Sequence, residues 1–122
     1  MNDKELLELA AKAAGMHKLT EWSDGICDHD SPHYGYPALH EAGPGGACGS
    51  WNPLTDDGDA LRLGVRLGLM VDLFECANDS VEASFDDGDF SAYCTEPVGE
   101  DKAAATRRAI VRVAAEIGKA ME

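Results

Sequence analysis

The sequence has few basic residues and no long apolar run. Ten Lys and Arg residues stand against 23 Asp and Glu residues, so the formal net charge is −13. Direct nucleic-acid binding needs Lys and Arg clustered on one face, and this balance argues against it. The longest uncharged apolar run, Leu67 to Val71, is far too short to span a bilayer. Charges at Asp3, Lys4 and Glu5 leave no place for the apolar region of a signal peptide, so we expect a cytoplasmic protein.

The four cysteines, Cys27, Cys48, Cys76 and Cys94, lack the close C-x-x-C spacing of zinc and redox motifs. An intracellular compartment keeps such thiols reduced, because disulfides persist only in oxidising environments. Isolated thiols most often fill small spaces in a core, and we expect that role here.

The charge that is present is unevenly distributed along the chain. Residues 1–55 carry 3 basic and 8 acidic side chains, residues 56–101 carry 2 and 13, and residues 102–122 carry 5 and 2. The middle of the chain is therefore an acidic block, and the last segment is basic. Many carboxylates favour solubility, and they also suit a protein that occupies a basic groove on a nucleic-acid-binding partner.

Chain length and the distribution of glycine and proline indicate how the chain is organised. At 122 residues and 44% hydrophobic content, the chain can bury one core, so a single domain over residues 1–122 is expected. Residues 16–50 are broken by several Gly and Pro residues and are expected to be irregular and loop-rich, with a short strand near residues 18–22. Binding residues tend to lie on such ordered loops.

Helical spacing of apolar residues predicts helices over residues 3–14, about 56–67 and about 101–121. Thr55 is expected to cap the second helix, whose first-turn carboxylates, Asp59 included, are explained by the helix dipole. Leu61 and Val65 are expected to share a face that another element approaches.

Segments 69–76, 81–86 and 90–95 predict the strands of an antiparallel meander. Asp87-Gly88 is expected to form a two-residue hairpin turn that sets Phe85 opposite Phe90. In this register Asp72 points inward, toward an arginine of the last helix. The expected core face of the sheet holds Phe74, Cys76, Val81, Ala83, Phe85, Phe90, Ala92 and Cys94.

The order α-loop-α-β-β-β-α predicts an α+β fold, with a three- to four-stranded antiparallel sheet packed with helices. Two runs of the sequence, residues 51–63 (WNPLTDDGDALRL) and 104–112 (AATRRAIVR), carry a resemblance to a known family. They resemble small phage and prophage proteins of the phage ABA (α-β-α) sandwich domain, with lambdoid NinX-like proteins as looser relatives. The resemblance implies an α-β-α sandwich-like arrangement and a bacterial host cell, but no well-established activity.

A metal site is one candidate for chemistry in the loop-rich segment. Cys27, His29 and His33 lie within seven residues and could bind zinc, with Asp30, His40 or Cys48 as a further ligand. Structural zinc sites usually have two tight ligand pairs, and only one such pair, His29 and His33, is present here. A polar surface loop without a cofactor is therefore the preferred interpretation. Cys27 or Cys48 with His29, His33 or His40 could also supply a nucleophile and base, although the spacing does not select this.

Three groups of side chains are candidates for binding. Two sets of arginines on the second and last helices could hold a phosphorylated ligand if they meet in space, and aromatic residues of the loop could stack on a base or anchor a protein. Carboxylates of the hairpin could contact a basic partner. The candidates are Arg62, Arg66, Arg107, Arg108, Trp22, Tyr34, Tyr36, Asp86, Asp87 and Asp89.

The leading functional hypothesis is a non-enzymatic phage or prophage accessory protein that inhibits a host defence system by docking its acidic surface on a host protein. One alternative is a protein that sequesters a nucleotide signal. Another is a metal-dependent hydrolase that uses the region from Cys27 to His40. The sequence leaves the partner and the presence of a homo-oligomer open.

Overall fold

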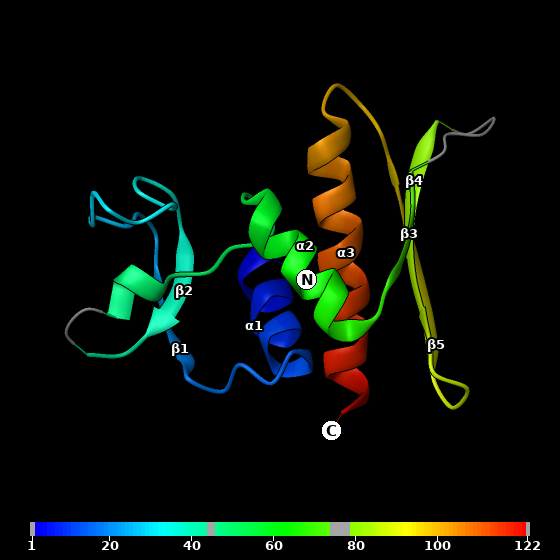
Figure 1. Ribbon diagram of the computed structural model, residues 1–122, viewed down its shortest axis with the longest axis horizontal. Helices are drawn as coiled ribbons and strands as arrows, with labels where there is room; N and C mark the ends of the chain where they lie inside the picture. The colour runs from blue at the N-terminus through cyan, green and yellow to red at the C-terminus, as the bar shows by residue number, and fades with distance from the viewer. Residues whose placement is uncertain (1, 44–45, 74–78, 122) are drawn as a thin grey trace.

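The computed structural model describes residues 2–43, 46–73 and 79–121. Three helices, one short 3-10 helix and five strands follow one another along these residues (Figure 1). The elements are α1 (Asp3–Ala13), β1 (Leu19–Ser23), β2 (Ala38–Glu41), η1 (Gly46–Gly49), α2 (Asp57–Leu67), β3 (Met70–Asp72), β4 (Ser80–Asp86), β5 (Ser91–Pro97) and α3 (Lys102–Ala120).

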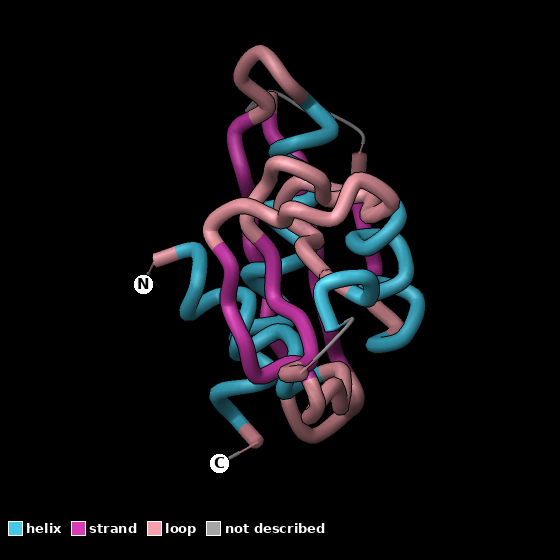
Figure 2. The backbone as a smooth tube through the Cα atoms, turned by 90° about the vertical axis from the view of Figure 1, so that its left-hand side faces the viewer, coloured by secondary structure: helices cyan, strands magenta, loops and turns pink. Residues whose placement is uncertain are grey.

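The α+β fold class, with an antiparallel sheet packed against helices, is confirmed. The helices form a middle layer, with sheet β3-β4-β5 on one side and the two-stranded sheet β1-β2 on the other (Figures 1 and 2). Helix α3 lies at the centre, because it contacts α1, α2, β4 and β5. None of the helices in the described ranges is both long and apolar enough to cross a bilayer.

The helix boundaries follow from capping. Asn2 caps α1 by accepting a hydrogen bond from the Glu5 N–H at 2.8 Å, and α1 ends before Gly15, whose φ of 75° is in the left-handed region. The expected cap of α2 was wrong by one residue. Asp56, rather than Thr55, caps α2, because its carboxylate accepts from the Asp59 N–H at 2.8 Å.

Small residues allow α1 and α3 to pack closely. Ala10, Ala11 and Ala14 of the first helix and its C-cap are buried, and so are Ala114 and Ala115 of α3. Gly118 of α3 lies against the α1 backbone, where an added Cβ would be 2.2 Å from the Leu9 carbonyl oxygen. The contact between the two helices therefore requires glycine at this position.

The hairpin between β4 and β5 has a longer connection than the sequence predicts. Asp86 pairs with Ser91, so four residues, 87–90, form the turn instead of two. The Asp87 carboxylate widens the turn by accepting hydrogen bonds from the backbone N–H groups of Asp89 (2.9 Å) and Phe90 (2.8 Å). The register differs by two residues, which preserves the inward faces because side chains alternate with period two.

The inward face of β4 and β5 is therefore as predicted for Val81, Ala83 and Cys94, which are all buried, whereas Phe90 lies in the turn and not on β5. The register of β3 is different. Val71 pairs with the inward Ala83, whereas Asp72 pairs with Glu82, so Asp72 belongs to the outer face and the expected inward orientation was wrong. Phe74 and Cys76, expected on the inward face, lie outside the described residues.

The loop-rich segment contains more regular structure than expected. The strand expected near residues 18–22 is β1, and it pairs with β2, which the sequence pattern does not reveal. A backbone bridge between Leu39 and Trp51 extends this small sheet toward α2. The segment lies on the opposite side of the helices from β3-β4-β5 (Figure 1), so it does not cover the outer face of that sheet.

Candidate protein-docking surface

The outer face of the three-stranded sheet has apolar and acidic side chains in alternate rows. One row runs Met70–Ser84–Tyr93 across the strands. The row on one side runs Asp72–Glu82–Thr95, and the row on the other side pairs Asp86 with Ser91. We call this set of eight residues the acidic sheet face: Met70, Asp72, Glu82, Ser84, Asp86, Ser91, Tyr93 and Thr95.

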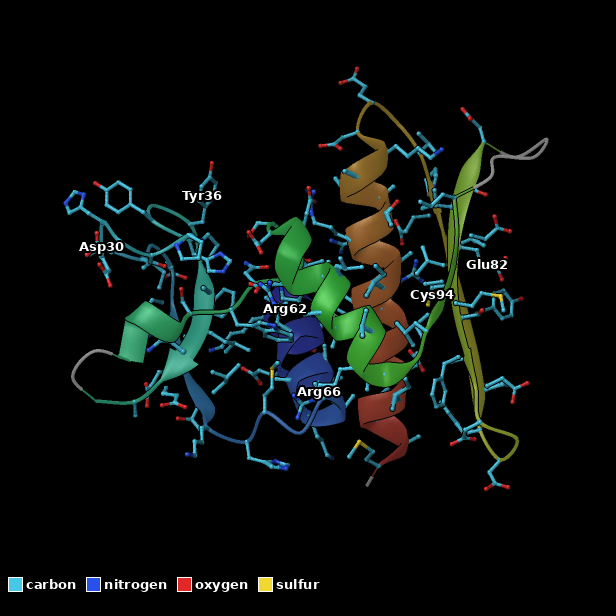
Figure 3. All side chains as sticks on the ribbon, viewed as in Figure 1. Asp30, Tyr36, Arg62, Arg66, Glu82 and Cys94 are labelled. Carbon is cyan, nitrogen blue, oxygen red and sulfur yellow. The ribbon has the colours of Figure 1, made fainter. Side chains whose placement is uncertain are left out.

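The acidic sheet face is open to solvent within the described part of the chain. Tyr93 and Met70 are each 71% exposed, which is high for large apolar side chains. Figure 3 shows Glu82 pointing away from the helices, while Cys94 of the neighbouring strand points toward α3. Two large apolar side chains thus lie in the open between two rows that carry carboxylates.

The β4-β5 turn adds carboxylates at one end of the acidic sheet face. Asp86 accepts the Gly88 N–H at 2.9 Å, and Asp87 accepts the two backbone N–H groups described above. The hydrogen bonds from Phe90 and Asp89 lower the pKa of the Asp87 carboxyl below its usual 3.8. Asp87 therefore has a local structural role, whereas Asp89, which is exposed, extends the acidic surface.

An apolar groove lies between α2, β3 and α3. It has a volume of about 470 Å³ and is lined by apolar side chains that include Leu61, Val71, Leu73 and Ile110. Leu61 is 67% exposed and Val65, one turn further along α2, is 72% exposed, so the face expected to be approached by another element is uncovered by the described residues. The buried face of α2 instead contains Ala60 and Leu63.

Three of the candidate arginines are bonded to carboxylates of the chain, and the fourth, Arg66, is exposed on α2. Arg62 donates to Asp59 at 2.7 Å, Arg107 donates to Asp57 at 2.6 Å, and Arg108 donates to Asp3 at 3.1 Å. These carboxylates offset the positive charge that a phosphate would need. Arg62, Arg107 and Arg108 do not form one cationic pocket, because each of these three guanidinium groups is directed to a different carboxylate.

The loop aromatics do not form one surface. The Trp22 indole packs against the core and donates to Asp24 at 2.9 Å. Tyr34 is stacked on His29 with ring centroids 4.4 Å apart, and Tyr36 is exposed and points away from the body of the protein (Figure 3).

The candidate metal ligands Cys27, His29 and His33 lie in different environments. Cys27 is exposed and His29 stacks on Tyr34, whereas His33 is 2% exposed and its Nε2 is 2.8 Å from Asp59. Within the described ranges, the one group of three potential ligand residues whose ligand atoms all lie within 4.8 Å of one another is His33, Asp56 and Asp59.

The group around Asp59 is already satisfied by hydrogen bonds inside the protein. The Asp59 carboxylate accepts from His33, from the Asn52 N–H at 3.0 Å and from Arg62. The cation that neutralises it is thus a guanidinium group, which favours a structural role over metal binding. Asp59 is buried, so the helix dipole alone does not explain this residue.

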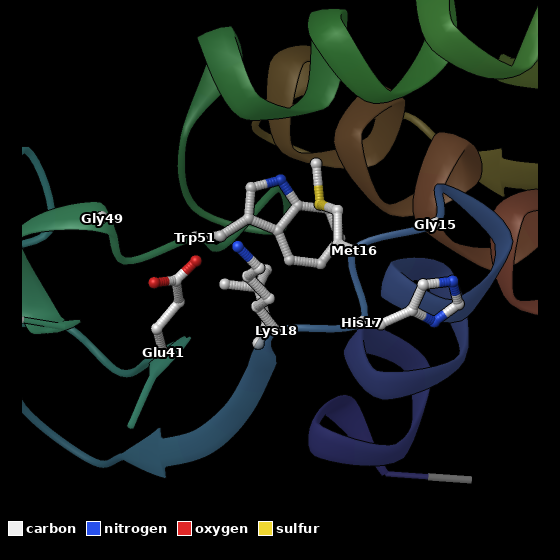
Figure 4. A pocket seen from close by; sticks show the side chains of 8 residues that line it. Gly15, Met16, His17, Lys18, Glu41, Gly49 and Trp51 are labelled. Carbon is white, nitrogen blue, oxygen red and sulfur yellow. The ribbon is translucent and has the colours of Figure 1, made fainter. Parts of the chain in front are cut away.

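A cavity of about 400 Å³ lies beside the turn that joins α1 to β1 (Figure 4). The Trp51 ring and Met16 form its apolar part, and Lys18 and Glu41 contribute opposite charges. The glycine-rich segment contributes Gly49 from η1, but it does not open onto a helix as a phosphate-binding loop would.

No protein-family model, curated protein or solved structure matched this chain in the comparisons. The resemblance to the phage ABA sandwich family therefore stays a prediction. The geometry of the chain itself supplies the functional evidence, and its most distinctive features are the acidic sheet face and the apolar groove beside it.

Sequence reasoning identified the hairpin carboxylates but missed the apolar part of the surface. Met70, Leu61 and Tyr93 were assigned to regular elements without a binding role. For Tyr93 the available signal was its position next to Cys94 in a strand, because neighbouring side chains of a strand point to opposite faces and Cys94 was expected on the core face.

Proposed function

We propose that this protein acts by binding, and that its acidic sheet face and apolar groove dock onto a basic surface of another protein. The observation that carries the proposal is the row of Met70, Ser84 and Tyr93 between two rows with carboxylates. Protein interfaces commonly combine a central aromatic or apolar anchor with a polar rim, and this arrangement has both parts.

Charge determines the chemistry of the partner. Residues 69–100 contain nine Asp and Glu residues and no Lys, Arg or His. A basic partner is attracted to such a surface and its association is accelerated. A second copy of this chain, with a formal net charge of −13, is repelled, so we favour a basic protein over self-association.

The apolar contacts account for affinity, because steering alone gives weak and salt-sensitive complexes. Tyr93 supplies a large rigid ring, and the groove beside Leu61 and Leu73 has room for apolar side chains of the partner. Burying these exposed groups releases free energy in proportion to the apolar area removed from water.

The resemblance to small phage proteins supplies the biological context of the proposal. A phage protein that binds without catalysis is well suited to inhibit a host defence protein, and defence proteins that act on nucleic acid carry basic grooves. We therefore include inhibition of a host defence protein in a bacterial cell as the expected outcome of docking.

The test compares two variants that carry the same net charge. The first replaces three carboxylates of the docking region, Glu82→Gln, Asp86→Asn and Asp89→Asn. The control replaces three exposed carboxylates elsewhere, Glu8→Gln, Asp30→Asn and Glu41→Gln. Proteins retained from a bacterial lysate are identified, purified and titrated by calorimetry against each variant at low and high salt.

We expect the docking variant to lose affinity for the purified partner by roughly tenfold and the control to lose little, because local charge decides the interaction. Tyr93→Ala should cost at least about 1 kcal/mol of binding free energy. High salt should weaken the wild-type complex. Equal affinities for both charge variants, or retention of a second copy of the chain alone, would contradict the proposal.

The two alternatives have separate signatures. A nucleotide-binding protein should be stabilised against heat by a nucleotide without any partner, and the cavity beside Trp51 gives this alternative a site to test. A metal-dependent hydrolase should purify with a stoichiometric metal ion and lose activity in His29→Ala or His33→Ala.

A further inference from the structure

Ser23 and His40 form a hydrogen-bonded pair on the two-stranded sheet, on the far side of the helices from the docking surface. Ser23 is the last residue of β1, and His40 lies diagonally across from it on β2, since the residue directly opposite Ser23 is Ala38. The Ser23 Oγ is 2.7 Å from the His40 Nε2. This is the distance expected between a hydroxyl nucleophile and its general base.

The second ring nitrogen of His40 determines the direction of the hydrogen bond. His40 Nδ1 is 2.8 Å from the carbonyl oxygen of Glu41. A carbonyl oxygen can only accept, so Nδ1 carries the hydrogen and the neutral ring has its lone pair on Nε2. Ser23 Oγ–H therefore donates to His40, and the proton is already directed from the hydroxyl to the base.

The backbone carbonyl of Glu41 has the orienting role that a carboxylate has in a Ser-His-Asp triad, since it holds the imidazole in one tautomer. Glu21 is directly opposite His40 in the register, and directly opposite residues have Cβ atoms about 4.5–5.5 Å apart.

Accessibility distinguishes this pair from the other polar clusters of the loop-rich half. Ser23 and His40 are half-buried, so neither side chain is fully enclosed by the protein. His33 is buried against a carboxylate, and the Ser31–Ser50 hydroxyl pair, 2.9 Å apart, is buried. Among the described residues, Ser23 is thus the hydroxyl that is hydrogen-bonded to a histidine and is only half-buried.

We propose that Ser23 is a nucleophile activated by His40 and that it takes acyl groups from small carboxylic esters. The Ser23 oxygen bonds to the ester carbonyl carbon while its proton passes to His40 Nε2. The bond to the alkoxy group then breaks, and that group leaves as an alcohol with the proton from His40. Water, deprotonated by His40, hydrolyses the acyl-serine to a carboxylic acid and free Ser23, so ester and water give acid and alcohol. This activity is independent of the docking function.

The test uses a fluorophosphonate probe, which phosphonylates activated serines with loss of fluoride, and p-nitrophenyl acetate as the ester. A Cys27→Ala background removes the thiol that is exposed among the described cysteines, so that it cannot compete as a nucleophile. The labelled residue is located by peptide mass spectrometry. We expect one phosphonyl group and, with the ester, one acetyl group, both on Ser23.

His40→Gln is the decisive variant, because glutamine keeps hydrogen-bonding capacity but cannot act as a base at neutral pH. We expect the rate of Ser23 labelling to fall by at least about 100-fold, the lower range for loss of a general base. Ser23→Ala should abolish both labelling and ester turnover. Ser80→Ala, at a half-buried serine of β4 outside the eight residues of the acidic sheet face, is the control and should leave both rates unchanged.

Circular dichroism and urea unfolding of each variant separate loss of the base from loss of the fold. Equal labelling rates in wild type and a folded His40→Gln variant would overturn the proposal. Labels spread over several exposed serines would do the same. Because the docking surface is unchanged in these variants, partner binding should persist, and failure here leaves the proposed function standing.

Discussion

The two sheets lie on opposite sides of the helical layer, and their polar side chains are used in opposite ways. Around β1-β2, polar groups bond to one another, as in the Ser23–His40, Ser31–Ser50 and His33–Asp59 pairs. On the outer face of β3-β4-β5, side chains such as Glu82 and Tyr93 face solvent. Internal bonding fixes an irregular loop, whereas an open face retains its charge and apolar area for a partner.

Removing Asp59 should have the largest effect on stability, because Asp59 is a partner in one of the buried polar pairs that hold the loop-rich segment in place. Asp59→Ala leaves the buried His33 ring and the Asn52 N–H without their acceptor. We expect a loss of about 3 kcal/mol in the free energy of unfolding, measured by urea denaturation. Asp57→Ala is the control, since its exposed carboxylate makes a surface ion pair with Arg107, and it should cost less than about 1 kcal/mol. Similar losses in both variants would contradict the structural role of Asp59.

A change in the close contact between α1 and α3 should have the next largest effect on stability. Gly118→Ala places a Cβ against the Leu9 carbonyl oxygen and should destabilise the protein by about 1–3 kcal/mol. Gly64→Ala is the matched control in α2, where an added Cβ meets no atom within 4 Å. It should stabilise the protein by up to about 1 kcal/mol, because alanine is the better helix former. If both variants shift the urea midpoint in the same direction, the close α1–α3 contact is not present.

The reactivities of two native cysteines compare the loop-rich segment with the inward face of β5, and this test needs no substitution. Cys27 of the loop is exposed, whereas Cys94 points toward α3 and burial raises the pKa of its thiol above 9.0. We expect Cys94 to react with a thiol reagent at neutral pH at least about tenfold more slowly than Cys27, since the thiolate is the reactive species. Peptide mapping after timed quenching assigns the two rates. Equal rates would mean that β5 does not bury its inward face.

The smallest effect concerns the pH dependence of the β4-β5 turn. The pKa of Asp87 is lowered below 3.8 in the folded protein by hydrogen bonds from Phe90 and Asp89. The resulting stability is therefore present above pH 3.8 and is lost as the pH falls through the folded pKa. Asp87→Asn should show a flatter dependence of the unfolding midpoint on acid pH. Carbon-13 titration of the Asp87 carboxyl checks the direction of the shift.

Features set by local sequence were predictable. The start of α1, the end of α1 near Gly15 and the inward alternation of Val81, Ala83 and Cys94 depend on neighbouring residues, and they agree with the structure. The turn length was missed because the carboxylate of Asp87 binds two backbone N–H groups, which a dipeptide rule for Asp-Gly does not include.

Features set by distant residues were not predictable. The partner of Asp59 is His33, which lies 26 residues earlier, so the first turn of α2 gave no sign of a buried cluster. Helical spacing placed Leu61 and Val65 on one face but did not determine what covers that face. The pairing of His40 with Ser23 depends on β2, which has no distinctive pattern in the sequence.

The short edge strand β3 has a consequence for how copies of this protein behave at high concentration. An exposed edge strand offers unpaired backbone groups to other chains, and proteins protect such edges with short strands, charges and proline. Here β3 has three residues and carries Asp72, and the opposite edge strand, β5, ends at Pro97. The carboxylates that would attract a basic partner thus also oppose edge-to-edge aggregation. A bound partner would neutralise these charges, but it would also cover the sheet and so keep other copies of the protein away from it.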